Sequence, residues 1–315
     1  MSDETPPLIR AKDLIEVVRI SILAVISWTI PERHWDSIAR VIVRLIACLG
    51  VGRTRSRRQR RKHSFDDRIA PFISNSLETR MSAHYHVARM QAFRDYRPGG
   101  WRPEIQVIGA EHIEAAREKG HGVVLWVAPF RYSDLVTKKG LHEAGYRVSH
   151  LSRPSHPFSP TLFGIRVLNP IWTRIEDRYL AERVRLGDSS GSGSALKILR
   201  DRLKENRIVS ITVGRQARKT VRVAFLGSTT RFATGPVHLA CTSKAALLPL
   251  FSVRTDTGIL AVNIESPLIQ PTEGNTDERY KAVIQQYVQK LEQYVLDYPS
   301  QWDTWWALEQ GVEEA

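Results

Sequence analysis

The chain has 315 residues, and 42% of them are hydrophobic, so it can bury a full core as one large α/β domain or two smaller ones. Its 46 Lys and Arg residues outnumber 33 Asp and Glu residues, which gives a formal charge of +13 and a surface that attracts polyanions. The two cysteines, Cys48 and Cys241, match no metal-ligand or CxxC spacing, and we expect both to be free, buried thiols. The composition argues against a disordered protein, and no metal or bound cofactor is predicted.

The N-terminal segment is apolar over Leu14–Ile30, about the length of a membrane helix. Glu16 and Arg19 interrupt its start and no small-residue cleavage site follows, so it is not a secretory signal. Two apolar stretches, Ile20–Ile30 and Ile38–Leu49, predict two helices. A monotopic or single-pass anchor is favoured, and a pair of ordinary core helices is the alternative.

A basic run, Arg53–Lys62, follows these helices directly. Near anionic lipid such a run contributes roughly 1 kcal/mol per residue. No aromatic residues interleave the arginines, so nucleic acid is not expected, although a solvated linker without a partner is an alternative. We therefore predict membrane-associating helices and a polybasic linker over residues 1–62, at the cytoplasmic face of the inner (plasma) membrane, held peripherally or by a single N-terminal anchor.

Residues 63–315 are predicted to form one α/β domain, because short apolar runs alternate with helical ones from about Trp101. The expected strands are Gly122–Ala128, Arg147–Leu151, Ile208–Val213, Val221–Leu226, Ala246–Val253 and Ile259–Ile264. The expected helices are Glu111–Lys119, Asp134–Ala144, Ser194–Glu205, Thr234–Thr242 and Asp277–Tyr298.

The most informative segment is Pro129–Asp134, which follows the apolar run Val123–Ala128. That run is typical of a buried strand, so Pro129–Asp134 should lie at its carboxyl end and lead into the next helix. Open α/β sheets bind their ligands at this edge. The segment is therefore the predicted place of the chemistry.

Further segments follow one another in a distinctive order and spacing. They are Gly109–Gly120, Ser152-Arg153-Pro154, Val223–Gly227, Ala233–Ala240, Leu248–Arg254 and Tyr298–Trp306. Together with the Pro129–Asp134 segment they resemble the lipid A lauroyl/myristoyl acyltransferases, within the wider lysophospholipid acyltransferase superfamily. The resemblance covers Glu104–Leu308 and the apolar N-terminal segment. It implies an acyltransferase-like α/β fold, with a mixed sheet flanked by helices and a membrane-associating helical segment before it.

The chain departs from the family's pattern at two places. The family motif is His, four residues, then Glu or Asp; here Asp134 takes the acidic position and Pro129 the histidine's. The segment Val213–Gln216 also lacks the aspartate of the family's Asp-Gln pair. In the family the histidine is the general base for a hydroxyl that attacks an acyl-carrier thioester. Proline offers no base, and this loss alone should cost ~10²- to 10⁴-fold in rate.

Three explanations of Pro129 remain open. Another residue could supply the base, either Asp134 itself or a nearby histidine such as His121, His150 or His156. The protein could instead be a non-catalytic relative that binds lipid or a carrier protein. Finally, an amine acceptor could make a strong base unnecessary.

Asp134 is the predicted catalytic residue, and three arginines are the predicted substrate-binding residues. Arg131 and Arg153 border the expected cleft and suit phosphate recognition, because guanidinium forks match phosphate oxygens. Arg166 falls at about the position of the lipid-phosphate arginine that the resemblance implies. The C-terminal tryptophans, Trp302 among them, are expected to pack under the sheet or touch the bilayer, without chemistry.

The favoured function is that of an acyltransferase enzyme. It would transfer an acyl group from an acyl-carrier protein or coenzyme A thioester to a lipid-like or amphipathic acceptor at the membrane surface. Anionic membrane lipid is the further expected partner. The alternative is a non-catalytic relative that binds lipid or an acyl-carrier partner, which Pro129 and the missing Asp-Gln pair favour and the retained Asp134 opposes.

Overall fold

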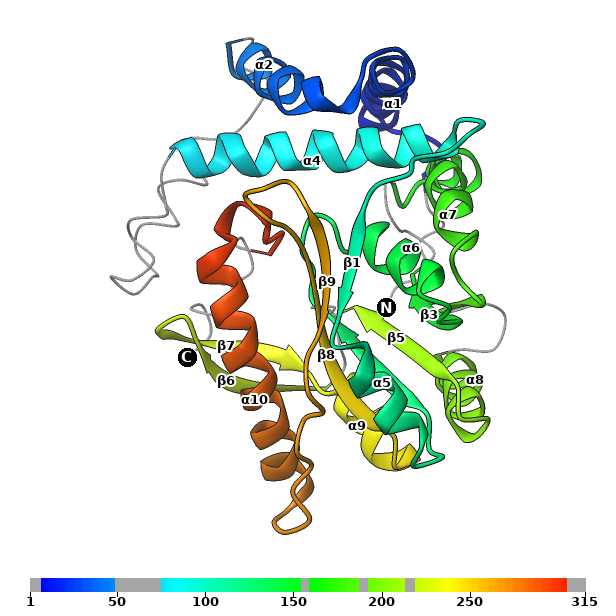
Figure 1. Cartoon of the computed structure of the whole chain (residues 1–315), viewed down its shortest axis with the longest axis vertical. Coiled ribbons are helices and arrows are strands. Elements are labelled where there is room, and N and C mark those ends of the chain that lie inside the picture. The colour runs from blue at the N-terminus through cyan, green and yellow to red at the C-terminus, as the bar shows by residue number, and fades with distance from the viewer. Residues whose placement is uncertain (1–6, 49–74, 154–158, 187–191, 213–218, 305–315) are drawn as a thin grey trace.

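The computed structural model describes residues 7–48, 75–153, 159–186, 192–212 and 219–304 of the chain (Figure 1). Four features that the sequence singled out lie outside these residues: the Arg53–Lys62 run, His156, the Val213–Gln216 segment and the last tryptophans.

A seven-stranded mixed sheet forms the centre of the molecule (Figure 1). All neighbouring strands run parallel except β8 and β9, which are antiparallel. Their order across the sheet is β1 (Ile105–Ile108), β9 (Leu260–Ile264), β8 (Ala246–Arg254), β2 (Val123–Val127), β5 (Ile208–Thr212), β3 (Val148–Ser152) and β4 (Glu182–Arg185). The predicted mixed α/β sheet is confirmed. The two edge strands, β1 and β4, were not predicted, because they are short and, as edge strands often are, partly polar.

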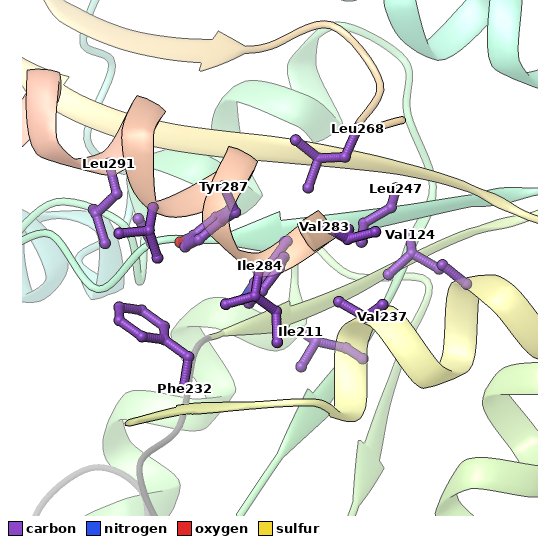
Figure 2. Packing of buried hydrophobic residues seen from close by; sticks show 14 of the residues in the cluster. Val124, Ile211, Phe232, Val237, Leu247, Leu268, Val283, Ile284, Tyr287 and Leu291 are labelled. Carbon is purple, nitrogen blue, oxygen red and sulfur yellow. The ribbon is translucent and has the colours of Figure 1, made fainter. Parts of the chain in front are cut away.

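Helices cover both faces of the sheet. Alternate residues of β2 point to opposite sides and are apolar, so each face carries a core that has to be covered. Val124 and Trp126 belong to the core on one face, and Val123, Leu125 and Val127 to the core on the other. The first core is covered by α8 (Ser192–Lys204), α9 (Gly235–Ser243) and α10 (Thr276–Asp297), and Figure 2 shows side chains of α10 packed toward it. The second is covered by α4 (Asn75–Tyr96), α5 (Ala110–Arg117), α6 (Val136–Glu143) and α7 (Asn169–Asp177).

One predicted strand forms outside the main sheet. Val221–Leu226 corresponds to β6 (Thr220–Phe225), which within the described part of the chain pairs with β7 (Ser228–Ala233) alone, in an antiparallel hairpin. Its two-residue turn puts both Leu226 and Gly227 at positive φ, the backbone that such hairpin turns require. The hairpin packs against α10 rather than extending the central sheet.

The N-terminal segment forms α1 (Ala11–Thr29), a 3₁₀ turn at Glu32–His34 and α2 (Trp35–Cys48). Both helices pack on the side of α4 that faces away from the sheet (Figure 1). Within the described residues, no helix is sufficiently long and apolar to span a bilayer. The expectation of two buried thiols was wrong, because Cys48 ends α2 in an exposed position and Cys241 is only partly buried.

Candidate functional site

The predicted motif forms a tight turn at the end of β2. The Phe130 N–H donates to the Ala128 carbonyl at 2.9 Å, which closes a three-residue turn centred on Pro129. The Ser133 hydroxyl donates to the same carbonyl at 2.7 Å, so the turn is fastened from two sides. Proline suits the central position, because its ring fixes φ and the bond that closes the turn uses the N–H of Phe130, so the N–H that proline lacks is not needed for it. Pro129 is thus part of the turn's construction.

The C-terminal segment clamps this turn. After α10, a short 3₁₀ helix (Pro299–Gln301) brings the chain back, and Phe130 pairs with Trp302 in an antiparallel bridge. The Arg131 N–H donates to the Gln301 carbonyl at 2.7 Å, and the Asp303 N–H donates to the Pro129 carbonyl at 3.0 Å. Trp302 is 2% exposed, which confirms that it packs within the core. Two segments that are far apart in the sequence are therefore held together by backbone hydrogen bonds.

An ion pair links the side chains of the turn and the clamp. Arg131 Nε lies 2.5 Å from Asp303 Oδ1, and the Arg131 guanidinium also lies over the Tyr85 ring of α4, 5.3 Å from its centroid. Burial raises the pKa of Asp303 to about 7; Asp134 adds to this rise, whereas Arg131 and Arg89 oppose it. Asp303 is therefore a carboxylate that can bind and release a proton near neutral pH.

Helix α4 contributes two histidines to the same region. His84 Nδ1 lies 2.8 Å from the hydroxyl of Tyr132, a residue of the turn that is 1% exposed. His86 is 5% exposed, and its Nδ1 has no hydrogen-bond partner among the described residues. Burial, followed by neighbouring arginines, lowers the pKa of each histidine to about 4. Both are therefore neutral at neutral pH.

Arg254, at the end of β8, connects the site to the N-terminal helices. It forms a bidentate ion pair with Asp36 of α2, with N–O distances of 2.9 and 2.8 Å. Although burial opposes the effect, this pair holds the pKa of Asp36 below its usual value. The Gln301 side chain bonds both the N–H and the carbonyl of Arg254, at 2.8 and 2.6 Å. Arg254 of β8 thus contacts both the clamp, through Gln301, and α2, through Asp36.

The structure brings together some of the predicted site residues and separates others. Arg131 and Asp134 lie in the same cluster, because both follow β2 and both influence the pKa of Asp303: Asp134 raises it and Arg131 lowers it. The Asp134 carboxylate makes no hydrogen bond or ion pair within the described residues, and its backbone carbonyl accepts from Lys138. Arg153 lies at the end of β3, on a different strand, and Arg166 is exposed in a π-helical turn at Gly164–Leu168.

The predicted substitute histidines do not reach Asp134. His121 is exposed, and His150 is buried within the sheet, where its Nδ1 lies 2.8 Å from the Ser210 hydroxyl. In the described part of the chain, no histidine bonds the Asp134 carboxylate. The sequence analysis missed Asp303 and the two α4 histidines, because nothing in the sequence pattern shows which segment crosses the end of β2.

Other candidate sites are weaker. A hollow of about 700 Å³ lies beside β6 and the first turn of α10, lined by residues such as Arg222 and Lys281. A helix of 22 residues is roughly 33 Å long, so this hollow and the clamp are at opposite ends of α10. Among the described residues, no group of three His, Cys, Asp or Glu side chains is arranged to hold a metal ion.

The comparison with protein-family models agrees with the resemblance found in the sequence. A family model described as bacterial lipid A biosynthesis acyltransferase matches residues 34–308. Among solved structures, the 1-acyl-sn-glycerophosphate (LPA) acyltransferase PlsC from Thermotoga maritima aligns with 82% of this chain and 97% of its own, at 12% identity and a TM-score of 0.35. The search of curated proteins gives no match. Because the family model spans most of its length, the chain belongs to the bacterial lipid A biosynthesis acyltransferase family.

Proposed function

We propose that the protein transfers an acyl group from an acyl-carrier protein or coenzyme A thioester to a lipid-like or amphipathic acceptor at the cytoplasmic membrane surface. The observation that carries this proposal is the charged cluster at the end of β2, where Asp134 keeps the family's acidic position beside the partly exposed Arg131–Asp303 pair. Family membership supports acyl transfer as the reaction class.

The cluster contains the groups that such a reaction needs. An acceptor hydroxyl or amine attacks the thioester carbonyl, and the carbon–sulfur bond breaks as the new ester or amide bond forms. A carboxylate with a pKa near neutrality can take the proton of the attacking group. Arg131 and Arg153 remain the proposed contacts for a phosphate of the donor or acceptor, with Arg166 as a further, exposed candidate.

The outer surface of α1 and α2 supports the membrane location. Leu14, Val18, Ile22 and Val25 follow one another at helical spacing on α1, and each is more than half exposed. On α2, Val41 and Leu45 are likewise more than half exposed. Exposed arginines of the same region are Arg33, Arg40 and Arg44. Apolar side chains beside exposed cations are the combination that binds an anionic bilayer surface.

Helix α4 separates this outer surface from the site by one layer. α1 and α2 pack on its outer side, while His84 on α4 reaches the turn residue Tyr132 (Figure 1). An acceptor from the bilayer would therefore have to pass α4 to reach the turn. The Asp36–Arg254 pair fixes α2 to the same end of the sheet.

Vesicle binding tests the membrane location. The double variant Val18→Asp/Val25→Asp places two charges on the outer surface and should lower binding to vesicles of phosphatidylethanolamine with about one-third phosphatidylglycerol by tenfold or more. Ile269→Asp is the matched control, because Ile269 is 75% exposed and its backbone bonds Gln286 of α10 rather than α1 or α2, and binding should not change. Binding should also weaken with salt, since charge attraction is screened over ~10 Å at 0.1 M. If the wild-type protein does not bind these vesicles, the proposed membrane location is wrong.

Release of free thiol tests the reaction. Lauroyl-coenzyme A and lauroyl acyl-carrier protein serve as donors, each with an under-acylated lipid A disaccharide, a lysophospholipid or a long-chain amine as acceptor. Asp134→Asn should lower transfer by ~10²-fold or more if the carboxylate serves the reaction, with unchanged thermal unfolding. Asp201→Asn is the control, because Asp201 lies near the end of α8 and, within the described residues, its carboxylate pairs with the exposed Lys204 alone.

A non-catalytic lipid- or carrier-binding role is the second candidate, because Pro129 is built into the turn that the family uses for its histidine. It predicts that wild-type protein releases no thiol from any donor and acceptor pair, yet still binds the acyl-carrier protein or the vesicles. Measurable transfer to any acceptor would exclude it.

A further inference from the structure

The backbone of the clamp places the Asp303 side chain next to the position that the family gives to its histidine. The Asp303 N–H donates to the carbonyl of Pro129 itself, and the preceding residue, Trp302, bridges to Phe130. Trp302 is anchored in the core, where its ring lies 5.4 Å from that of Phe225. The position of Asp303 is thus set by main-chain bonds and a buried side chain, as a reacting group requires.

One oxygen of the Asp303 carboxylate is held and the other is available. Oδ1 is buried and forms an ion pair with Arg131 Nε at 2.5 Å, although these two atoms do not meet hydrogen-bond geometry, whereas Oδ2 makes neither an ion pair nor a hydrogen bond within the described residues. The side chain as a whole keeps 30% of its surface exposed, so a substrate group can reach it. A carboxylate that is oriented through one oxygen and open at the other has the geometry of a general base.

Resting on the acyl transfer proposed above, we infer that Asp303 is the proton acceptor of this site and substitutes for the histidine that Pro129 replaces. As the acceptor's oxygen or nitrogen bonds to the thioester carbonyl carbon, its proton moves to the Asp303 carboxylate. The tetrahedral intermediate then collapses, the carbon–sulfur bond breaks, and the proton passes from Asp303 to the departing thiolate. The products are the acylated acceptor and a free thiol, and the carboxylate is regenerated.

The charges around Asp303 favour this role over the alternatives in the cluster. Asp134 and burial raise its pKa to about 7, against the cations Arg131 of the turn and Arg89 of α4. A base is most effective when its pKa lies near the working pH. His84 and His86, with pKa values lowered to about 4, are weaker bases, and His86 is 5% exposed. Asp303 is the better proton acceptor of these groups.

Kinetics of three variants test the inference. The readout is thiol release from lauroyl-coenzyme A or lauroyl acyl-carrier protein, measured with each of the three acceptors named above. Asp303→Asn keeps the shape of the side chain but removes the base, and should lower kcat by ~10²- to 10⁴-fold with little change in KM for the donor. Asp303→Glu should recover part of the rate. Asp297→Asn, an exposed change at the end of α10, is the matched control and should behave as wild type.

The pH profile separates a proton acceptor from a residue that only holds the clamp together. Wild-type kcat/KM should fall below an apparent pKa near 7, and this limb should be missing from the residual activity of Asp303→Asn. An active wild type whose rate and profile are unchanged by Asp303→Asn overturns the inference and leaves the proposed function standing. A wild type that transfers nothing from any donor overturns both.

Discussion

Two groups of charged and polar side chains lie at this end of the sheet, and they differ in burial and in how completely they are paired. Between α6 and α7, Glu176 is 1% exposed and accepts from Trp172 at 2.6 Å, while Lys138 and Arg183 approach it to 3.1 and 2.6 Å. At the turn after β2, by contrast, Asp303 has one free carboxylate oxygen and His86 has an unpartnered nitrogen, within the described residues.

The difference separates a structural network from a reactive one. A buried charge whose every partner is in place contributes to folding and has no capacity left for a substrate. Buried or half-buried polar groups without full pairing cost stability, and proteins tolerate them mainly where they act. The network around Glu176 is of the first kind, and the cluster of Asp303, Arg131 and the α4 histidines is of the second.

The largest expected effect comes from breaking the fully paired network. Glu176→Gln keeps an oxygen for the Trp172 N–H but leaves Lys138 and Arg183 without their shared charge. Removal of one partner from a buried ion pair costs about 3–5 kcal/mol, and we expect the lower end, because Arg183 keeps its pair with Asp177. Urea unfolding measures this loss of free energy.

Glu205→Gln is the control for that comparison. Glu205 pairs with Arg202 and Arg207, but its side chain is 43% exposed, and exposed pairs contribute at most about 1 kcal/mol. Equal losses for the two variants would show that burial and complete pairing do not distinguish the Glu176 network from the surface.

The next effect concerns the pH dependence of stability, where the two kinds of titrating group in the site act with opposite sign. The pKa of His86 is lowered to about 4 in the folded state, below its unfolded value near 6.5. Between these values the unfolded chain binds more protons, so stability falls as the pH drops, by roughly 1.4 kcal/mol per unit. His86→Gln should therefore make the dependence between pH 4.5 and 6 shallower.

Asp303→Asn should change the same dependence in the opposite direction. The pKa of Asp303 is raised to about 7, so the folded state binds more protons between pH 4 and 7, and this contribution to stability is lost as the pH rises. Its removal should leave a steeper increase of stability with pH. Denaturant midpoints across the range test both variants, with His121→Gln as an exposed control. A parallel shift of the two curves would contradict the opposite signs.

Much of the fold could be predicted from the sequence, because β2, β5 and β8 are apolar runs between clear helical segments. Helix α4 was not predicted. It is polar overall and buries residues toward two layers at once, so it lacks a simple one-sided pattern. The position of Pro129 and Asp134 at the end of β2 followed from the strand alone.

The site itself could be predicted only in part. Arg131 and Asp134 are adjacent to a recognisable strand, whereas Asp303 reaches them through the backbone bridge between Phe130 and Trp302. Such pairing between distant segments depends on where α10 ends relative to β2, which local sequence does not encode. The contacts of the N-terminal helices with the rest of the domain are long-range in the same sense, as the Asp36–Arg254 pair shows.

A smaller effect is expected where α2 joins the site. The Asp36–Arg254 pair is bidentate, but the Asp36 side chain is 41% exposed, so solvent screens it. A double-mutant cycle with Asp36→Ala and Arg254→Ala should give a coupling energy of about 1 kcal/mol in unfolding experiments. A coupling above about 3 kcal/mol would instead place this pair with the buried network around Glu176.

The smallest effect is predicted for Pro129→His, which restores the residue that the family's motif has at this position. The turn is closed by the Phe130 N–H and fastened by Asp303 and Ser133, so its backbone should keep its shape, and the new side chain enters a site that already contains Asp303 as a base. Loss of the fixed proline φ should cost about 0.4–1 kcal/mol of stability. Thiol release should rise at most a few-fold, because the turn and the clamp are arranged around Asp303 rather than around an imidazole. A gain of ~10²-fold or more that depends on Asp134 and persists in Pro129→His/Asp303→Asn would show that an intact histidine site had lost only its histidine. In that case the unpaired groups of the cluster would be remnants of the family's original chemistry.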